Sequence, residues 1–311
     1  MGHTMMKSAV LAVLSIGFLN LTSAAQQAVP EGNVARMIVT AEPRHGSTVP
    51  AITRNDVTVY QGRDRADVVD WRPLQGDQAA LELFVLIDDG LDPSVGGQID
   101  VLRKFIASQP ATTAVGVGYV QNGQVSIGQN LTLDHNQAAK ALRIPLGSSG
   151  IPGSPYTAIQ ELIGGWPYQQ TRREIVLLSP GIDGLYNGGG MQDPYVLDAI
   201  TAAQKGGVVV FSIYAPAAGH FGHSMWRGNS GQNYLSQLSE ETGGESYGLF
   251  MGAPVSIAPN LDDISRKLAN QYLLAFVSRP QRKAGAEGVS VKTQVPDVDL
   301  LAADQVYAPA G

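Results

Sequence analysis

Three aspartates follow one apolar stretch of the sequence. Residues 81–92 read LELFVLIDDGLD, so Asp88, Asp89 and Asp92 come directly after seven mostly apolar residues. A run this apolar, bounded by turn-forming residues, predicts a strand that is buried on both faces of a parallel sheet. In open α/β sheets, ligands bind beyond the carboxyl ends of such strands. We therefore expect a site around these aspartates.

The segment AGHFGHSMWRG holds a second group of candidate site residues. His220 and His223 are three residues apart, so their rings could share a metal ion. Trp226 and Arg227 belong to the residue types that dominate binding hot spots. The predicted loop 215–231 follows an apolar strand, so it should reach the same edge of the sheet as the aspartates. We predict that these four residues contact a partner; the alternative is a mobile surface loop.

Two other chemical patterns are incomplete. The Gly/Ser/Pro segment 147–155 opens a predicted helix, where backbone N–H groups could bind phosphate, but no lysine follows as a P-loop requires. Ser179 ends an apolar strand but lacks the Gly-x-Ser-x-Gly turn of a hydrolase nucleophile. We therefore predict neither a phosphate site nor a catalytic serine.

Composition and charge are those of a globular chain with an acidic balance. Of 311 residues, 44% are apolar and 15% are charged, which is enough apolar sequence for a large core. The formal net charge of −6 argues against nucleic acid or an anionic membrane as a partner. Cysteine is absent, which excludes disulfides and thiolate metal sites. The core must therefore stabilise the fold.

Residues 1–25 have the pattern of a secretory signal peptide. Lys7 precedes an apolar run over 9–21, and the small residues 23–25 provide a cleavage site. The apolar run is too short to span a bilayer, and no later run approaches ~18 consecutive apolar residues. We expect an exported protein, periplasmic or extracellular, whose mature chain begins at Gln26.

The remaining sequence divides into segments with different periodicity. From 80 to 279, apolar strands such as 174–179 and 208–214 alternate with amphipathic helices, which predicts an α/β domain with a doubly wound, mainly parallel sheet. Residues 33–75 alternate with a period of two and predict a small β segment. Residues 286–311 return to that pattern, so we expect them to pack with 33–75.

The order of these elements and several residue strings resemble the von Willebrand factor type A (VWA) family. The likeness is greatest to a secreted bacterial group whose VWA domain sits between short β segments. The strings, in chain order, are VARMIVTAE, NDVTVYQG, FVLIDDGLD, REIVLLSPGIDG, LSEETGGESY, ANQYLLAFVS and VYAP. They extend over nearly all of the chain after residue 25, and the resemblance implies a VWA-like fold.

The resemblance also implies a metal-ion-dependent adhesion site at the carboxyl edge of the sheet. In the family, an Asp-x-Ser-x-Ser loop, a Thr from a second loop and an Asp after a later strand hold Mg²⁺ or Mn²⁺, and a carboxylate of the partner completes the coordination. Here Asp88 matches the first Asp, and Gly90 and Asp92 stand at the two Ser positions. Ser154 stands at the Thr position, with Thr157 as the alternative if the register differs.

Two expected ligands are missing from this pattern. Gly90 supplies no hydroxyl, and Pro180 replaces the later Asp, while Asp183 lies three residues further on. Asp92 adds a carboxylate where a neutral hydroxyl is usual, so a bound ion would attract a partner's carboxylate less strongly. The alternative is a degenerate site without metal. The candidate metal ligands are Asp88, Asp92, Ser154 and Asp183.

Two functions from different classes are compatible with these features. We predict a non-catalytic binding module that recognises a protein partner at the carboxyl edge of its sheet, because the sequence contains no convincing pair of nucleophile and base. The alternative is a metal-assisted hydrolase that uses Asp88 and Asp92 with His220 or His223. A structural protein with a relic site is a third possibility.

Overall fold

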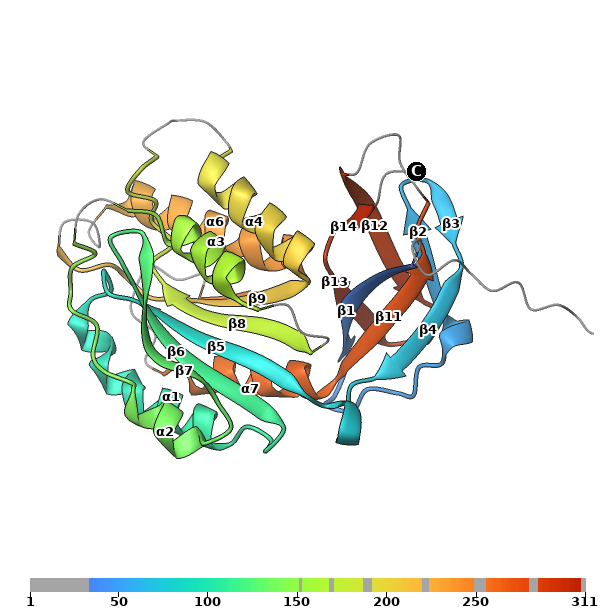
Figure 1. The fold of residues 1–311 in the computed structure, drawn as a ribbon, viewed down its shortest axis with the longest axis horizontal. Coiled ribbons are helices and arrows are strands. Elements are labelled where there is room, and N and C mark those ends of the chain that lie inside the picture. Colours follow the sequence, from blue (N-terminus) through green and yellow to red (C-terminus); the bar gives the residue numbers. More distant parts are fainter. Residues whose placement is uncertain are drawn as a thin grey trace, which may run out of the picture.

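A computed structural model describes residues 34–150, 153–167, 171–186, 192–219, 224–248, 256–279 and 285–308. The predicted signal peptide, residues 1–25, lies outside these ranges, as do His220 and His223. The described chain forms an α/β unit and a β unit that lie side by side (Figure 1). Within these ranges, no helix is both long and apolar enough to cross a membrane.

The α/β unit is built on one six-stranded sheet. Its strands are β5 (Leu81–Asp88), β6 (Thr113–Gln121), β7 (Gln124–Thr132), β8 (Arg172–Ser179), β9 (Val208–Tyr214) and β10 (Ser246–Tyr247). Their spatial order is β10-β9-β8-β5-β6-β7, and every neighbouring pair is parallel except β6 with β7. This doubly wound order confirms the predicted fold class, and the direction of winding reverses between β5 and β8.

The central strands form where the sequence is mostly apolar. Every residue of β5, β8 and β9 is buried, as expected for strands that are covered on both faces. The antiparallel pair β6 and β7 is closed by Asn122 and Gly123, whose φ angles are 54° and 73°. Both residues are in the left-handed region that a two-residue hairpin turn requires, and Asn-Gly is the dipeptide that favours it.

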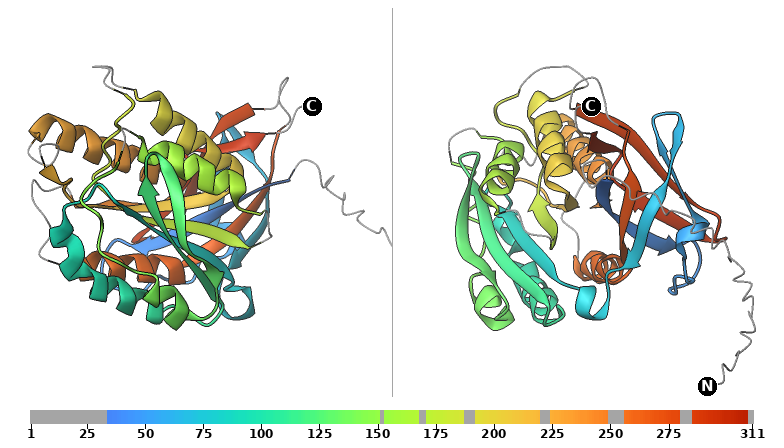
Figure 2. Two further views of the ribbon diagram at one scale, coloured as in Figure 1. Left: turned by 60° about the vertical axis from the view of Figure 1, so that its left-hand side comes forward. Right: turned by 45° about the vertical axis from the view of Figure 1, so that its right-hand side comes forward.

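Helices cover both faces of this sheet (Figures 1 and 2). One face packs against α1 (Ile99–Ala107), α2 (His135–Lys140) and α7 (Ala258–Ala269). The other face packs against α3 (Pro155–Gly165), α4 (Pro194–Gly206) and α6 (Met225–Thr242). Short 3-10 helices η2 (Arg54–Asp56), η3 (Gly76–Gln78) and η4 (Pro93–Gln98) lie in connections. The sheet is therefore enclosed along its length, and its ends are left to loops.

The β unit consists of two four-stranded sheets. The first has the order β13-β1-β11-β4, with β13 (Val298–Ala302), β1 (Val34–Pro43), β11 (Gln271–Val277) and β4 (Val68–Pro73). The second has the order β14-β12-β2-β3, with β14 (Gln305–Ala308), β12 (Gly285–Thr293), β2 (Val57–Gln61) and β3 (Asp64–Ala66). Apolar side chains from both sheets form one shared core. Strands from both ends of the chain thus build this unit.

Strand β11 belongs to a different unit from the one we expected. The predicted α/β range, 80–279, includes β11, whereas the strand pairs with β1 and β4 in the β unit. Leu274 and Phe276 of this strand are fully buried in the β core. The α/β unit therefore ends with α7, and the boundary at 279 is incorrect. The apolar sequence of β11 alone does not show whether the strand lies inside the antiparallel sheet of the β unit or in the parallel sheet of the α/β unit.

Candidate functional site

Asp88 ends β5 at the point where the winding of the sheet reverses. Its neighbour across this point is Ser179, the last residue of β8, whose hydroxyl donates a hydrogen bond of 2.8 Å to Oδ2 of Asp88. The backbone N–H of Gly90 donates to Oδ1 at 2.8 Å. Burial raises the pKa of Asp88 to about 6, and these two hydrogen bonds oppose the shift only in part. The carboxyl group thus lies where doubly wound sheets bind ligands.

Asp89 is fully buried and makes an ion pair instead of joining the site. Both of its carboxylate oxygens accept from the guanidinium of Arg143, at 2.6 and 2.7 Å. The guanidinium also stacks on the ring of Tyr119, 3.7 Å from its centroid. This bidentate, charge-assisted pair fixes the loop after α2 against the end of β5.

Asp92 acts as a helix cap. Its carboxylate accepts from the backbone N–H of Ser94 at 2.9 Å, at the start of η4. Its own backbone N–H donates to the carbonyl of Pro216 in the loop after β9. Asp92 thus accepts from a backbone N–H group at the start of η4 that has no partner within the helix. A serine at the same position could fill this role as well.

Ser154 and Asp183, two of the candidate metal ligands, lie next to each other. The hydroxyl of Ser154 donates to Oδ2 of Asp183 at 2.6 Å, and both side chains are buried. Oδ1 of Asp183 accepts from the backbone N–H groups of Leu185 and Tyr186, so this carboxylate holds its own loop together. The hydroxyl of Thr157, the alternative to Ser154, lies against the carbonyl of Gly123 in the hairpin.

A cavity of about 440 Å³ opens at this edge of the sheet. Its lining comes from the loops after β5, β6, β8 and β9, from the segment before α3, and from Arg227 on α6. Asp88 and Ser154 line it together with Arg227, whereas Asp92 and Asp183 do not. By residue number, the lining is 88, 90, 120–123, 147–150, 153–155, 180, 182, 184, 217–219 and 227.

The residues at the cavity do not fit a divalent cation. Ser154 donates to Asp183, and Asp92 and Asp183 are bound to backbone N–H groups, which leaves Asp88 as the one candidate carboxylate that lines the cavity. Positions 90 and 180 supply no oxygen side chain. Mg²⁺ requires near-octahedral oxygen ligands, and the side chains here would have to exchange several hydrogen bonds to provide them.

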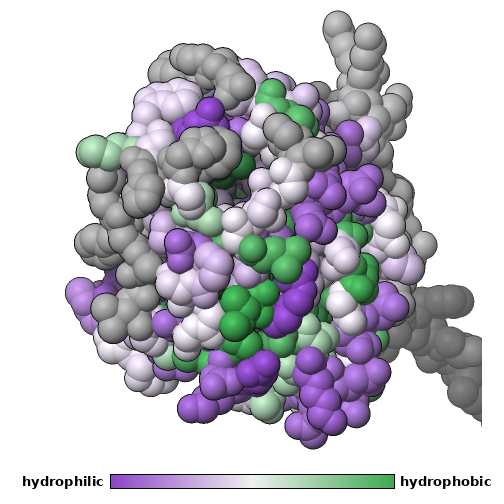
Figure 3. Space-filling model, turned by 90° about the vertical axis from the view of Figure 1, so that its left-hand side faces the viewer, coloured by the Kyte–Doolittle hydropathy of each residue, from purple (hydrophilic) through white to green (hydrophobic). Residues whose placement is uncertain are grey.

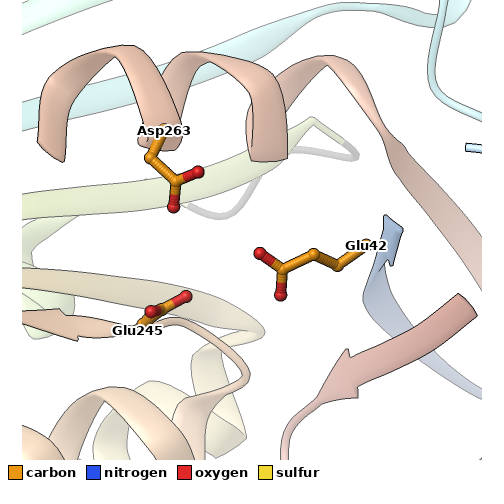
Figure 4. Close-up of side chains that lie close together, drawn as sticks. All are labelled: Glu42, Glu245 and Asp263. Atoms are coloured by element: carbon orange, nitrogen blue, oxygen red, sulfur yellow. The ribbon is translucent and has the colours of Figure 1, made fainter. Parts of the chain in front are cut away.

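One group of three carboxylates elsewhere has the spacing of a metal site. Of the described residues, Glu42, Glu245 and Asp263 bring carboxylate oxygens within 4.8 Å of one another, at the junction of the two units (Figure 4). The buried ammonium of Lys267 contacts all three, with Nζ 2.8 Å from Glu245 and 2.9 Å from Asp263. The lysine thus supplies the positive charge, and the group is an ion-pair network rather than a metal centre.

Several large exposed apolar side chains belong to the same chain segments as the residues that line the cavity. Leu146 directly precedes the lining residue 147, Leu185 follows 184, and Trp226 precedes 227. Figure 3 views this end of the molecule and shows apolar patches on it. Sequence reasoning singled out only Trp226 in this group; isolated apolar residues in Gly/Pro-rich segments were the available signal for the others. We call the following group the apolar rim: Ile144 (54% exposed), Leu146 (57%), Leu185 (46%), Met225 (65%) and Trp226 (59%).

Comparison with known proteins finds likeness at the level of structure. No protein-family model matches the chain. A search of curated proteins also gives no match. The solved structures that are similar include an aerotolerance-related membrane protein from Bacteroides fragilis, at 14% identity and a TM-score of 0.44 over 61% of this chain and 98% of that one. They also include the SpRpn10 VWA domain, at 11% identity and a TM-score of 0.39 over 60% of this chain and 95% of that one.

A third similar structure is the PilB minor pilin from Streptococcus sanguinis, at 16% identity and a TM-score of 0.39 over 64% of this chain and 63% of that one. Likeness at such identities concerns the fold alone. The six-stranded, doubly wound sheet with helices on both faces is the arrangement that the VWA resemblance implies for the α/β unit. The chain thus combines a doubly wound α/β unit with an attached β unit.

Proposed function

We propose that this chain is an exported, non-catalytic binding module that recognises a protein partner at the carboxyl edge of its six-stranded sheet, without a metal ion. The observation that carries the proposal is the cavity at the winding reversal, together with the exposed apolar rim on the segments that line it. Exposed apolar patches of this kind, next to polar groups, are typical of protein interaction sites. Export is supported by the sequence of residues 1–25.

The metal-assisted hydrolase is less well supported. Its two proposed carboxylates have other roles, since Asp88 is hydrogen-bonded to Ser179 and Asp92 caps η4. Of the five histidines, the described ranges contain His45 and His135, and neither lines the cavity. The ring of His135 contacts the carbonyl of Thr113, at the start of β6 and so at the opposite end of the sheet.

Two leucines of similar exposure allow a matched test of this surface. Leu146 belongs to the apolar rim and is 57% exposed; Leu133 is 63% exposed and follows β7, at the opposite end of the sheet. The mature chain, from residue 26, is immobilised and incubated with an envelope extract of its own organism. Bound protein is then quantified by mass spectrometry for the unaltered chain, Leu146→Ser, Trp226→Ala and Leu133→Ser.

We expect Leu146→Ser and Trp226→Ala to reduce capture of the same protein by about tenfold each, the size of a hot-spot loss. Leu133→Ser should capture as much as the unaltered chain, and a chelator should have no effect. Equal capture by the Leu146 and Leu133 variants would show that the partner binds elsewhere. Loss of capture in chelator would contradict the metal-free site.

A further inference from the structure

We propose that the cavity receives a basic side chain, lysine or arginine, from the partner, whose flanking apolar residues lie on the apolar rim. This inference rests on the proposed function and specifies the chemistry of the partner. It reverses the charge preference of the metal-dependent site that the VWA resemblance implies, in which the partner contributes a carboxylate.

The first argument is the negative charge of Asp88 in the cavity. Among the described residues that line the cavity, Asp88 is the one acidic residue, and its side chain is almost fully buried. Within the described residues, Gly90 donates to one carboxylate oxygen and Ser179 to the other, and each oxygen has a second lone pair that a further donor can use. Both present partners are neutral, so a cation beside Asp88 would stabilise a poorly solvated negative charge.

The second argument concerns a carboxylate of the partner placed beside Asp88. In a metal-dependent site the ion lies between the aspartate and the partner's carboxylate and neutralises both. Here the side chains at positions 90 and 180 cannot provide the oxygens that hold such an ion. A partner carboxylate would therefore approach the Asp88 carboxylate directly, and like charges in a poorly solvated site repel strongly.

The third argument is the shape of the cavity. Its walls carry glycine, alanine and serine in the loops before α3 and after β9, so backbone rather than long side chains borders the space. The volume of about 440 Å³ is ample for the aliphatic stem and charged head of a lysine or arginine. In such side chains the aliphatic part packs on apolar surface and the charged group contacts polar groups. This matches the apolar rim and the carboxylate of Asp88.

Arg227 also lines the cavity, from the first turn of α6. A guanidinium donates hydrogen bonds and accepts none, so it suits the main-chain carbonyls of the partner segment rather than the inserted cation.

The test uses three capped pentapeptides that differ only in the central residue. Each has leucine at both ends, glycine on either side of the centre, and lysine, norleucine or glutamate at the centre. Each is titrated into the ¹⁵N-labelled mature chain, and binding is followed by the shifts of backbone N–H signals, including those of Gly90, Gly123 and Gly150 at the cavity. Asp88→Asn is titrated in parallel, because the amide keeps the shape of the carboxylate and removes its charge.

We expect the lysine peptide to bind about tenfold or more tightly than the norleucine peptide, and the glutamate peptide to bind most weakly. In Asp88→Asn, the lysine and norleucine peptides should bind equally. Equal or tighter binding of the glutamate peptide would overturn the proposal, and so would a lysine preference that survives in Asp88→Asn. If that variant does not fold, the ranking of the three peptides on the unaltered chain decides the question.

Failure of all three peptides to shift the cavity signals would also overturn the inference. The proposed function is judged independently, by whether Leu146→Ser reduces capture from the extract while Leu133→Ser does not. Rim-dependent capture without a lysine preference would leave a binding module whose partner presents a different group.

Discussion

Glu174 is fully buried on β8, beside Arg172 and Gln271, and its carboxylate oxygens make no hydrogen bond of ordinary geometry. Burial raises the pKa of Glu174 to about 7 from an ordinary value of 4.5, and the charge of Arg172 lowers it by less. The folded chain therefore keeps this proton up to about pH 7, whereas the unfolded chain releases it near pH 4.5. Because the folded state binds more protons in this window, the free energy of unfolding should fall as pH rises through it.

Glu174→Gln should remove this contribution. Relative to the unaltered chain, the free energy of unfolding of the variant, measured by urea denaturation, should rise by about 1–3 kcal/mol between pH 4.5 and pH 7. The exposed Asp198 on α4 provides the control, and Asp198→Asn should keep the slope of the unaltered chain. A Glu174→Gln profile parallel to that of the unaltered chain would show that Glu174 does not titrate in this window.

Lys267 contacts three carboxylates at the junction of the units. Its side chain is 3% exposed and contacts Glu42 on β1, Asp263 on its own helix, and Glu245. Lys267→Met fills a similar volume but removes the buried cation that these three acids share, so the free energy of unfolding should fall by about 3 kcal/mol. Chemical denaturation at pH 7 measures the loss.

The adjacent residue is a natural control for this prediction. Arg266 pairs with the same Asp263 at 2.6 Å but is 57% exposed. Exposed pairs contribute about 0–1 kcal/mol, so Arg266→Met should change the stability by no more than that. If the two variants lose equal stability, burial of Lys267 does not carry the effect.

The three aspartates after β5 show how much of the site could be predicted from sequence. Their position at the edge of the sheet follows from the apolar run before them. The role of Asp89 cannot be predicted from the sequence, because its partner Arg143 is 54 residues away and contacts it only in the folded chain. Asp92 was a candidate ligand by its place in the VWA pattern, whereas its local sequence, Asp-Pro-Ser, also fits the helix cap that it forms.

At the scale of elements, α6 lies against the loop after β8 because two glycines meet there. A Cβ added to Gly231 would lie 2.1 Å from the carbonyl oxygen of Pro180, and one added to Gly181 would lie 2.3 Å from the carbonyl oxygen of Gly231. Gly231→Ala should therefore push the helix and the loop apart and reduce the free energy of unfolding by about 1–3 kcal/mol. Because this loop lines the cavity, peptide binding should weaken as well.

A glycine in open space tests whether this effect is specific. A Cβ added to Gly164 on α3 meets no atom within 4 Å. Alanine favours a helix over glycine, so Gly164→Ala should raise stability by about 0.5 kcal/mol. A Gly231→Ala variant as stable as Gly164→Ala would mean that α6 and the loop can separate without cost.

Helices and strands could be predicted where a sequence pattern fits only one kind of local structure. Mostly apolar runs predict β5, β8 and β9. Asn122 with Gly123 predicts the hairpin, because only a narrow range of backbone angles suits that turn. Strand β11 has a similarly apolar sequence but joins the β unit. Both environments bury both faces of a strand, so the distinction depends on pairing partners that are more than 200 residues away in β1.

At the scale of the whole molecule, the two units have separate cores but share a chain that passes between them twice. β4 leads into β5 through η3, and α7 leads into β11. The guanidinium of Arg172 lies at both crossings, since it donates to the carbonyl of Ala79 before β5 and to that of Leu268 at the end of α7. The junction thus holds the β unit at the end of the sheet away from the cavity.

This division predicts the effect of shortening the chain. Ending it after Arg279 removes β12, β13 and β14, which pair with β2 and β1, and exposes the core that the two β sheets share. The cores on either side of the six-stranded sheet contain no residue from the removed strands. In hydrogen exchange, amides of β1 and β4 should therefore lose most of their protection, while those of β5 and β8 keep it.

Loss of protection in β5 and β8 to the same degree would show that the two units fold only together. Retained protection in β1 would show instead that the C-terminal strands are dispensable for the β unit.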